Sequence, residues 1–314
     1  MKKRAGILSV FLLLLVPLLA SCSVSESLYR LSIKAERWLA GLTPGSVQVD
    51  DHRVCYLEGG KGETILLVHG FSADKDNWNR LARLLTPHYR VVAIDVPGFG
   101  ESSKLAGASY GVPSQVSRLD RVVAALGLDR FHLAGNSMGG AIAAEYAARF
   151  PDKVLSLALL DTAGVSGCPR RSELSQLLEK GDNPLLVSRP EDFDRVLDMV
   201  FVKRPWVPGS VKTYLARQAV ANREFDDKIF HDLHLEEYAI NDDLPRIRAR
   251  TLILWGDTDR LTDASCTQVL EQGLPESVTV VMKDCGHIPM IERPKETANH
   301  YLKFLQGPAS PPGG

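Results

Sequence analysis

The chain has 314 residues, of which 45% are hydrophobic, and its 37 Lys and Arg nearly balance its 38 Asp and Glu, for a net charge of −1. A chain of this length can bury a large core, as one large domain or two smaller ones. The balanced charge lacks the basic excess of proteins that bind nucleic acid, so no nucleic-acid partner is expected. The composition does not indicate an oligomeric state.

Residues 1–21 have the pattern of an export signal. Basic residues at positions 2–4 precede an uncharged, leucine-rich run over residues 5–20, as in signal peptides. The sequence LASC at 19–22 follows and resembles the bacterial lipobox, whose cysteine receives a diacylglycerol. This resemblance implies a mature chain anchored to a membrane of the bacterial envelope through lipid on Cys22. Ser23 follows this cysteine, and a non-acidic residue at that position resembles the pattern of lipoproteins that are sent to the outer membrane.

An uncleaved transmembrane anchor is the alternative for this N-terminus. The uncharged run has 16 residues, and about 20 are needed to span a bilayer. We therefore favour the lipoprotein.

Residues 22–46 are expected to form a membrane-proximal segment. Within it, apolar residues recur at spacings of three and four with basic residues beside them, which predicts an amphipathic helix at about 25–41. Two positions for this helix remain open. It packs on its own domain, or it lies in the membrane interface, where basic residues favour anionic headgroups.

From residue 47 onward, short β-rich apolar runs alternate with helical patterns. Six such runs predict the strands of a doubly wound, mostly parallel sheet, at residues 64–68, 91–94, 131–134, 154–160, 251–255 and 278–282. Residues 47–49 and 53–57 add an antiparallel edge, for about eight strands. The expected core comprises residues 47–162 and 247–307, followed by a flexible tail at 308–314.

A long helical stretch interrupts this alternation after Asp161. An insertion between two strands is expected to form a helical cap over the carboxyl edge of the sheet, where ligands bind, and we assign it residues 163–246. Its large apolar side chains include Phe193, Phe201 and Trp206. They are expected to line a hydrophobic acyl pocket or, equally, to form ordinary cap core.

Four cysteines remain besides Cys22. An envelope location permits disulfides, but spacing leaves open the pairing of Cys55, Cys168, Cys266 and Cys285. No CxxC or HExxH pattern occurs, and no metal is expected.

The run Gly135-Asn136-Ser137-Met138-Gly139-Gly140 lies where a predicted strand meets a predicted helix. A G-x-S-x-G pattern needs its glycines because a sharp turn lifts the serine clear of the sheet. We therefore predict Ser137 as the nucleophile. An oxyanion hole needs two backbone N–H groups, and fold logic assigns them to Met138 and, after the strand at 64–68, to Phe71.

The base and the acid are expected at the ends of other strands on the same edge. His287 follows the strand at 278–282 and is the predicted general base. Position alone leaves three candidates for the acid: Asp257, Asp259 and Asp161. His69 is interpreted as a structural histidine that supports its loop rather than as a second base.

Five segments together resemble the α/β-hydrolase superfamily over residues 50–305. They are HGF at 69–71, DVPGFGES at 95–102, GNSMGG at 135–140, WGDTD at 255–259 and DCGHIPMIERP at 284–294. The resemblance implies that the acid is Asp259, with Asp257 as the runner-up. It also implies an α/β-hydrolase fold with a helical cap and no metal or organic cofactor.

The GNSMGG sequence at 135–140, which is predicted to form the sharp turn or elbow around Ser137, is similar to those of bacterial family V lipases and of meta-cleavage C–C hydrolases. The latter usually carry Trp after the histidine, where this chain has Ile288, and the lipobox fits membrane-anchored lipases and phospholipases A. Dehalogenases and epoxide hydrolases carry Asp at the position of Ser137. The expected function is therefore carboxylic ester hydrolysis on a lipid or small ester. A C–C hydrolase is the alternative, and a non-catalytic binding protein is a second one.

Overall fold

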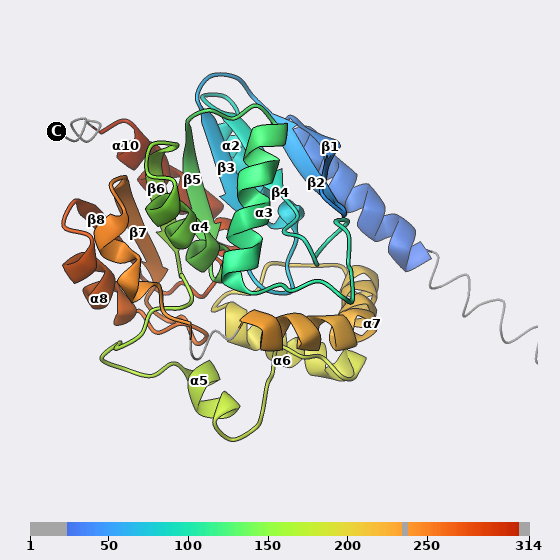
Figure 1. The fold of residues 1–314 in the computed structure, drawn as a ribbon. Coiled ribbons are helices and arrows are strands. Elements are labelled where there is room, and N and C mark those ends of the chain that lie inside the picture. The colour runs from blue at the N-terminus through green and yellow to red at the C-terminus, as the bar shows by residue number, and fades with distance from the viewer. Residues whose placement is uncertain (1–23, 234–237, 308–314) are drawn as a thin grey trace, which may run out of the picture.

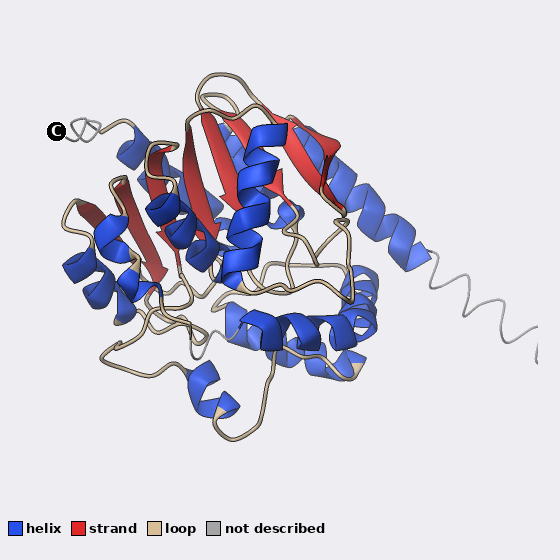
Figure 2. Ribbon diagram, viewed as in Figure 1, coloured by secondary structure: helices blue, strands red, loops and turns tan. Residues whose placement is uncertain are grey.

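The structure, a computed structural model, describes residues 24–233 and 238–307. An eight-stranded sheet in the order β1-β2-β4-β3-β5-β6-β7-β8 lies at its centre, with helices on both faces (Figures 1 and 2). β1 and β2 run antiparallel at one edge, and all neighbours from β4 to β8 pair in parallel. The predicted α/β-hydrolase fold with a mostly parallel sheet is therefore confirmed. The expectations for residues 1–23, including lipid on Cys22, and for the tail at 308–314 lie outside the described residues.

The strands coincide closely with the apolar runs of the sequence. They are β1 (Leu42–Val49), β2 (His52–Gly59), β3 (Thr64–Val68), β4 (Arg90–Ile94), β5 (Phe131–Asn136), β6 (Val154–Leu160), β7 (Arg250–Gly256) and β8 (Ser277–Met282). The edge pair is longer than the short runs suggested, because its hairpin pairs Leu42 with Gly59. The boundary expected at residue 47 therefore falls inside β1, and the sheet begins at Leu42.

Helices of the core cover both faces of the sheet. They are η1 (Lys75–Trp78), α2 (Asn79–Leu85), α3 (Val112–Ala125), α4 (Met138–Arg149), α8 (Cys266–Gly273), α9 (Pro289–Glu292) and α10 (Pro294–Leu305). Side chains alternate between the faces along a buried strand. In β3, Leu66 and Val68 join the apolar cluster under α3 and α4, while Ile65 and Leu67 join the cluster under α2 and α10.

The insertion between β6 and β7 lies at the end of the sheet toward which the parallel strands point (Figure 1). Its elements are α5 (Glu173–Leu178), η2 (Pro190–Asp192), α6 (Phe193–Val200), α7 (Gly209–Leu233), η3 (Ile240–Asp242) and η4 (Leu244–Arg246). Asp232 at the end of α7 accepts a hydrogen bond from the backbone N–H of Tyr110 at 2.9 Å. This contact ties the long cap helix to the loop before α3.

A disulfide joins Cys168, in the segment between β6 and α5, to Cys266 at the start of α8. It links residues 98 positions apart and so fastens the first part of the cap to the core. Cys55 and Cys285 are buried free thiols. The pairing left open by the sequence is thus Cys168 with Cys266.

A helix covers residues 24–39 at the outer edge of the molecule beside β1 and β2 (Figure 1). One side of it packs on the protein. Arg37 donates two hydrogen bonds to the Asp76 carboxylate at 2.7 and 2.6 Å, and the Tyr29 ring lies 4.8 Å from that of Tyr214 on α7. In the part of the chain that the structure describes, no helix is both long enough and apolar enough to cross a membrane.

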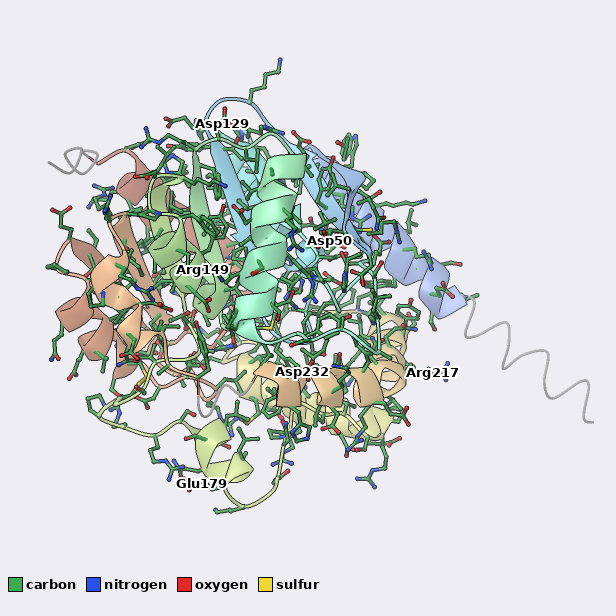
Figure 3. All side chains as sticks on the ribbon, viewed as in Figure 1. Asp50, Asp129, Arg149, Glu179, Arg217 and Asp232 are labelled. Carbon is green, nitrogen blue, oxygen red and sulfur yellow. A yellow bond between two sulfur atoms is a disulfide. The ribbon has the colours of Figure 1, made fainter. Side chains whose placement is uncertain are left out.

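Charged side chains of both signs are spread over the core and the cap. Figure 3 shows Asp129 and Arg149 on the core and Glu179 and Arg217 on the cap. This mixture agrees with the near-zero net charge of the sequence.

Candidate active site

Ser137 sits in a sharp turn between β5 and α4. Its φ of 55° and ψ of −121° are an unusual backbone conformation for a residue other than glycine. The flanking glycines allow it, because a Cβ on Gly135 would lie 2.0 Å from the carbonyl oxygen of Gly139, and one on Gly139 would lie 2.2 Å from that of Val68. The strand and the helix approach too closely for any side chain at these positions. The elbow predicted from G-x-S-x-G therefore has a steric cause.

The loop after β3 lies directly against the predicted nucleophile. A Cβ on Gly70 would come within 3.1 Å of the Ser137 Cβ. Phe71 is the next residue in the chain and therefore also lies close to Ser137. Met138 is the first residue of α4, so its N–H has no acceptor within the helix. The structure therefore places both predicted oxyanion donors beside Ser137.

His69 holds this loop in place. Its ring is fully buried, with Nδ1 2.7 Å from the carbonyl oxygen of Gly70 and Nε2 3.0 Å from the backbone nitrogen of Val96. Burial lowers the pKa of His69, which favours a neutral ring that donates from Nδ1 and accepts at Nε2. These contacts agree with a structural histidine, since both ring nitrogens are occupied by the backbone.

The cap also contacts the loop after β3, through Ser72, Asp226 and Phe230, which were not predicted from the sequence. Ser72 donates to Asp226 on α7 at 2.8 Å, and the ring of Phe71 packs edge-on against Phe230 of α7 at 5.5 Å between centroids. Ser72 has a φ of 52°. No local pattern marks these partners, because Ser72 and Asp226 are 154 positions apart.

His287 and Asp259 are in direct contact. The distance from His287 Nδ1 to Asp259 Oδ2 is 2.7 Å, and both side chains are buried. The Asp259 carboxylate also accepts hydrogen bonds from the backbone N–H groups of Leu261 and Thr262, at 2.8 and 3.2 Å. The Thr262 hydroxyl donates to Asp259 Oδ2 at 2.6 Å. Leu261 and Thr262 thus supply three hydrogen bonds that hold the carboxylate while it faces the imidazole.

Asp257, the other carboxylate of this loop, points elsewhere. It is exposed, and its side chain accepts a hydrogen bond from the neighbouring Thr258 hydroxyl at 2.8 Å. Asp161 is fully buried at the end of β6, and its Oδ1 accepts from the backbone N–H of Gly256 at 2.8 Å. Of the three candidate acids, Asp259 is the one hydrogen-bonded to His287.

The loop that carries His287, here called the histidine loop, is held next to the turn at Ser137 by hydrogen bonds. Asn136, which precedes the nucleophile, donates from Nδ2 to the carbonyl oxygen of His287 at 3.0 Å. The backbone N–H of His287 donates to the carbonyl oxygen of Val200 at 2.9 Å. Within the described residues, no hydrogen bond joins the Ser137 hydroxyl to the imidazole, and such contacts often tighten only with substrate bound.

The cap aromatics have different surroundings. Phe201 follows Val200, which bonds the histidine loop, and a Cβ on Gly286 would lie 3.2 Å from the Phe201 Cα. Phe193 begins α6 and is half-buried. Trp206 is 85% exposed, so it fits neither of the two expectations for it, a wall of a hydrophobic acyl pocket or ordinary cap core. A cavity of about 670 Å³ lies between α7 and the segment around η2, and Phe230 is among its lining residues.

Known proteins resemble this chain in sequence and in fold. The model of the α/β hydrolase fold family matches residues 63–204. Lipase 3 of Moraxella sp. (strain TA144) is 38% identical over 252 residues, which is 78% of each chain. A bacterial membrane phospholipase A of known structure is 50% identical with a TM-score of 0.90, and the match covers 97% of this chain and 99% of that one. A meta-cleavage product hydrolase from Pseudomonas fluorescens IP01 has a TM-score of 0.70 at 23% identity over 83% and 97% of the two chains, which shows the fold alone.

Proposed function

The chain belongs to the α/β-hydrolase family, and we propose that it releases fatty acids from lipid esters through Ser137, His287 and Asp259. An ester-hydrolysing enzyme of the lipase type agrees with both the curated lipases and the fold. The observation that carries the assignment of residues is the 2.7 Å contact between His287 and Asp259 beside the Ser137 elbow. The 50% identical membrane phospholipase A favours phospholipids as the substrate class.

The proposed mechanism follows from the positions of these groups. His287 takes the proton of Ser137 as Oγ attacks the ester carbonyl, and Asp259 stabilises the imidazolium. The amides of Phe71 and Met138 bind the oxyanion. The imidazolium then protonates the departing alcohol. Water, activated by the same histidine, attacks the acyl-enzyme, releases the fatty acid and regenerates Ser137.

Assays on ester substrates and on a dienone, together with labelling by a serine-reactive probe, test this function. We expect hydrolysis of p-nitrophenyl esters and of phospholipid, labelling by a fluorophosphonate probe, and no turnover of a dienone. Turnover of the dienone alone would favour the C–C hydrolase, which uses the same three residues. Absence of both labelling and turnover in the folded protein would favour a binding protein.

Acyl-chain selectivity is expected to reside in cap aromatics near the catalytic loops. Truncating Phe201 or Phe230 to Ala should change the preference between short and long p-nitrophenyl esters more than the rate on the short ester, because only a long acyl chain reaches a pocket wall. Trp206→Ala is the matched control, since its ring is exposed. Equal losses at every chain length would identify Phe201 and Phe230 as packing residues.

We further propose that the protein is an envelope lipoprotein anchored through Cys22. The disulfide between Cys168 and Cys266 supports export, because such bonds are rare in the cytosol. The helix over residues 24–39 leaves five large apolar side chains between 43% and 78% exposed on one face: Val24, Leu28, Leu31, Trp38 and Leu39. Lys34 lies beside this face. An apolar face flanked by a basic residue suits a lipid interface, and it begins two residues after the predicted lipid anchor.

Metabolic palmitate labelling of the wild type and of Cys22→Ser tests the anchor. We expect label and membrane residence for the wild type and no label for Cys22→Ser. One lipid chain binds only marginally, so the full set of acyl chains should be needed for firm attachment. Unlabelled wild type that stays in the membrane with residues 1–21 uncleaved would favour the transmembrane anchor. Two cytoplasmic proteins would contradict export altogether.

A further inference from the structure

Asp161 is a fully buried carboxyl group for which the proposed mechanism has no step. It follows β6 with a φ of 46°, in the left-handed region that few residues other than glycine adopt. Its backbone N–H donates to the carbonyl oxygen of Leu254 at 2.9 Å, and its Oδ1 accepts from the N–H of Gly256 at 2.8 Å. These two bonds hold the side chain at the base of the loop that carries Asp259.

The second oxygen of this carboxyl group, Oδ2, lacks a donor. It is buried, and no N–H or O–H group among residues 24–233 and 238–307 hydrogen-bonds to it. One oxygen of Asp161, one oxygen of Asp259 and one ring nitrogen of His287 all lie within 4.8 Å of one another. A buried oxygen without a donor is costly, and two ionised carboxylates so close together repel. A proton on Asp161 would relieve both costs.

We infer that Asp161 is a positioning residue that remains protonated and donates a hydrogen bond to Asp259, which extends the chain of Ser137, His287 and Asp259 by one group. The inference rests on the proposed roles of those three residues. Asp161 keeps its proton throughout turnover. Its task is to hold the carboxylate of Asp259 in the orientation that faces the imidazole.

The surroundings of Asp161 favour its neutral form. Burial, and then the charge of Asp259, raise the pKa of Asp161 well above its ordinary value. A hydrogen bond donated to Asp259 would act in the same direction, as does the negative charge of Glu292 on α9, whereas the bond from the Gly256 N–H opposes them. The nearby Cys285 thiol brings no charge, because burial raises its pKa.

The protonation state matters for the base. With Asp161 neutral, Asp259 is the carboxylate whose charge faces His287. An ionised Asp161 would place a second negative charge near the ring and stabilise the imidazolium, which cannot accept the proton of Ser137. A neutral donor at this position therefore orients Asp259 without blocking the base.

Two substitutions of the full-length protein separate these states. Asp161→Asn removes the ionisable group but keeps an N–H donor for Asp259 and an acceptor for Gly256. We expect it to retain nearly wild-type kcat/KM. In a plot of kcat/KM against pH, the acid limb, where activity falls toward low pH, should stay at the wild-type pH. Asp161→Ala removes the donor, and we expect a loss of roughly 10- to 100-fold in kcat with little change in KM, as for a misplaced catalytic group.

Infrared difference spectroscopy supplies a readout that does not depend on activity. The wild type should show the carbonyl band of a protonated carboxylic acid that titrates only at high pH, and Asp161→Asn should lack it. Absence of such a band, or an acid limb that moves to lower pH in Asp161→Asn, would show that Asp161 is ionised and would overturn the inference. If Asp161→Ala does not fold, the Asn variant and the spectrum still decide. A wild type with the band but without probe labelling would contradict the proposed function instead.

Discussion

Ser137→Ala is expected to lower kcat for ester hydrolysis by about 10⁵- to 10⁶-fold and to abolish fluorophosphonate labelling, as loss of the nucleophile does in other triad enzymes. Folding should be preserved, because the change removes one hydroxyl from a half-buried side chain and leaves the close contacts of Gly135 and Gly139 intact. Steady-state kinetics on a p-nitrophenyl ester, together with thermal unfolding, measure both effects.

Ser117→Ala is the matched control for this substitution. Ser117 lies on α3, where its hydroxyl donates to the carbonyl oxygen of Pro113 at 2.9 Å, and its loss should leave activity and labelling unchanged. Substantial turnover by folded Ser137→Ala would show that another group is the nucleophile.

Asp259→Asn should cost about 10⁴-fold in kcat, because an amide in place of the carboxylate favours the wrong imidazole tautomer, as in other serine hydrolases. The neighbouring substitution Asp257→Asn should have almost no effect, since Asp257 is exposed and, within the described residues, its carboxylate accepts a hydrogen bond only from the Thr258 hydroxyl of its own loop. Both variants remove one negative charge from the same short loop. The pair therefore separates the hydrogen bond to His287 from the general electrostatics of the loop.

The kcat/KM values of the two variants on one soluble ester decide between the carboxylates. Circular dichroism verifies that each variant is folded, which matters because Asp259 also accepts backbone hydrogen bonds from Leu261 and Thr262. A larger loss at Asp257, or equal losses at both positions, would contradict the assignment of Asp259.

The sequence by itself determined the sheet and the sharp turn at Ser137. The buried strands β3 and β6 match the ranges expected from their apolar runs, because a strand covered on both faces must be apolar along its whole length. The elbow at Ser137 could likewise be predicted from the G-x-S-x-G pattern. Its glycines are required by contacts within a few residues and with one neighbouring strand, so the cause of the pattern is local.

Only the tertiary structure decided which groups meet across the chain. Position left Asp161, Asp257 and Asp259 as candidate acids, and the contact of Asp259 with His287 distinguishes it. The pairing of Cys168 with Cys266, the outward apolar face of the N-terminal helix and the start of β1 at Leu42 also came from the structure alone.

The physical reason is the same in each case. Periodicity and turn chemistry act between neighbours in sequence, whereas the partners of a side chain depend on where distant segments pack. Ser72 and Asp226 are 154 positions apart, and Asp259 and His287 are 28 apart. No local signal records such a contact, so a residue such as Asp226, which bonds the loop after β3 from the cap, could be recognised only once the fold had brought the two together.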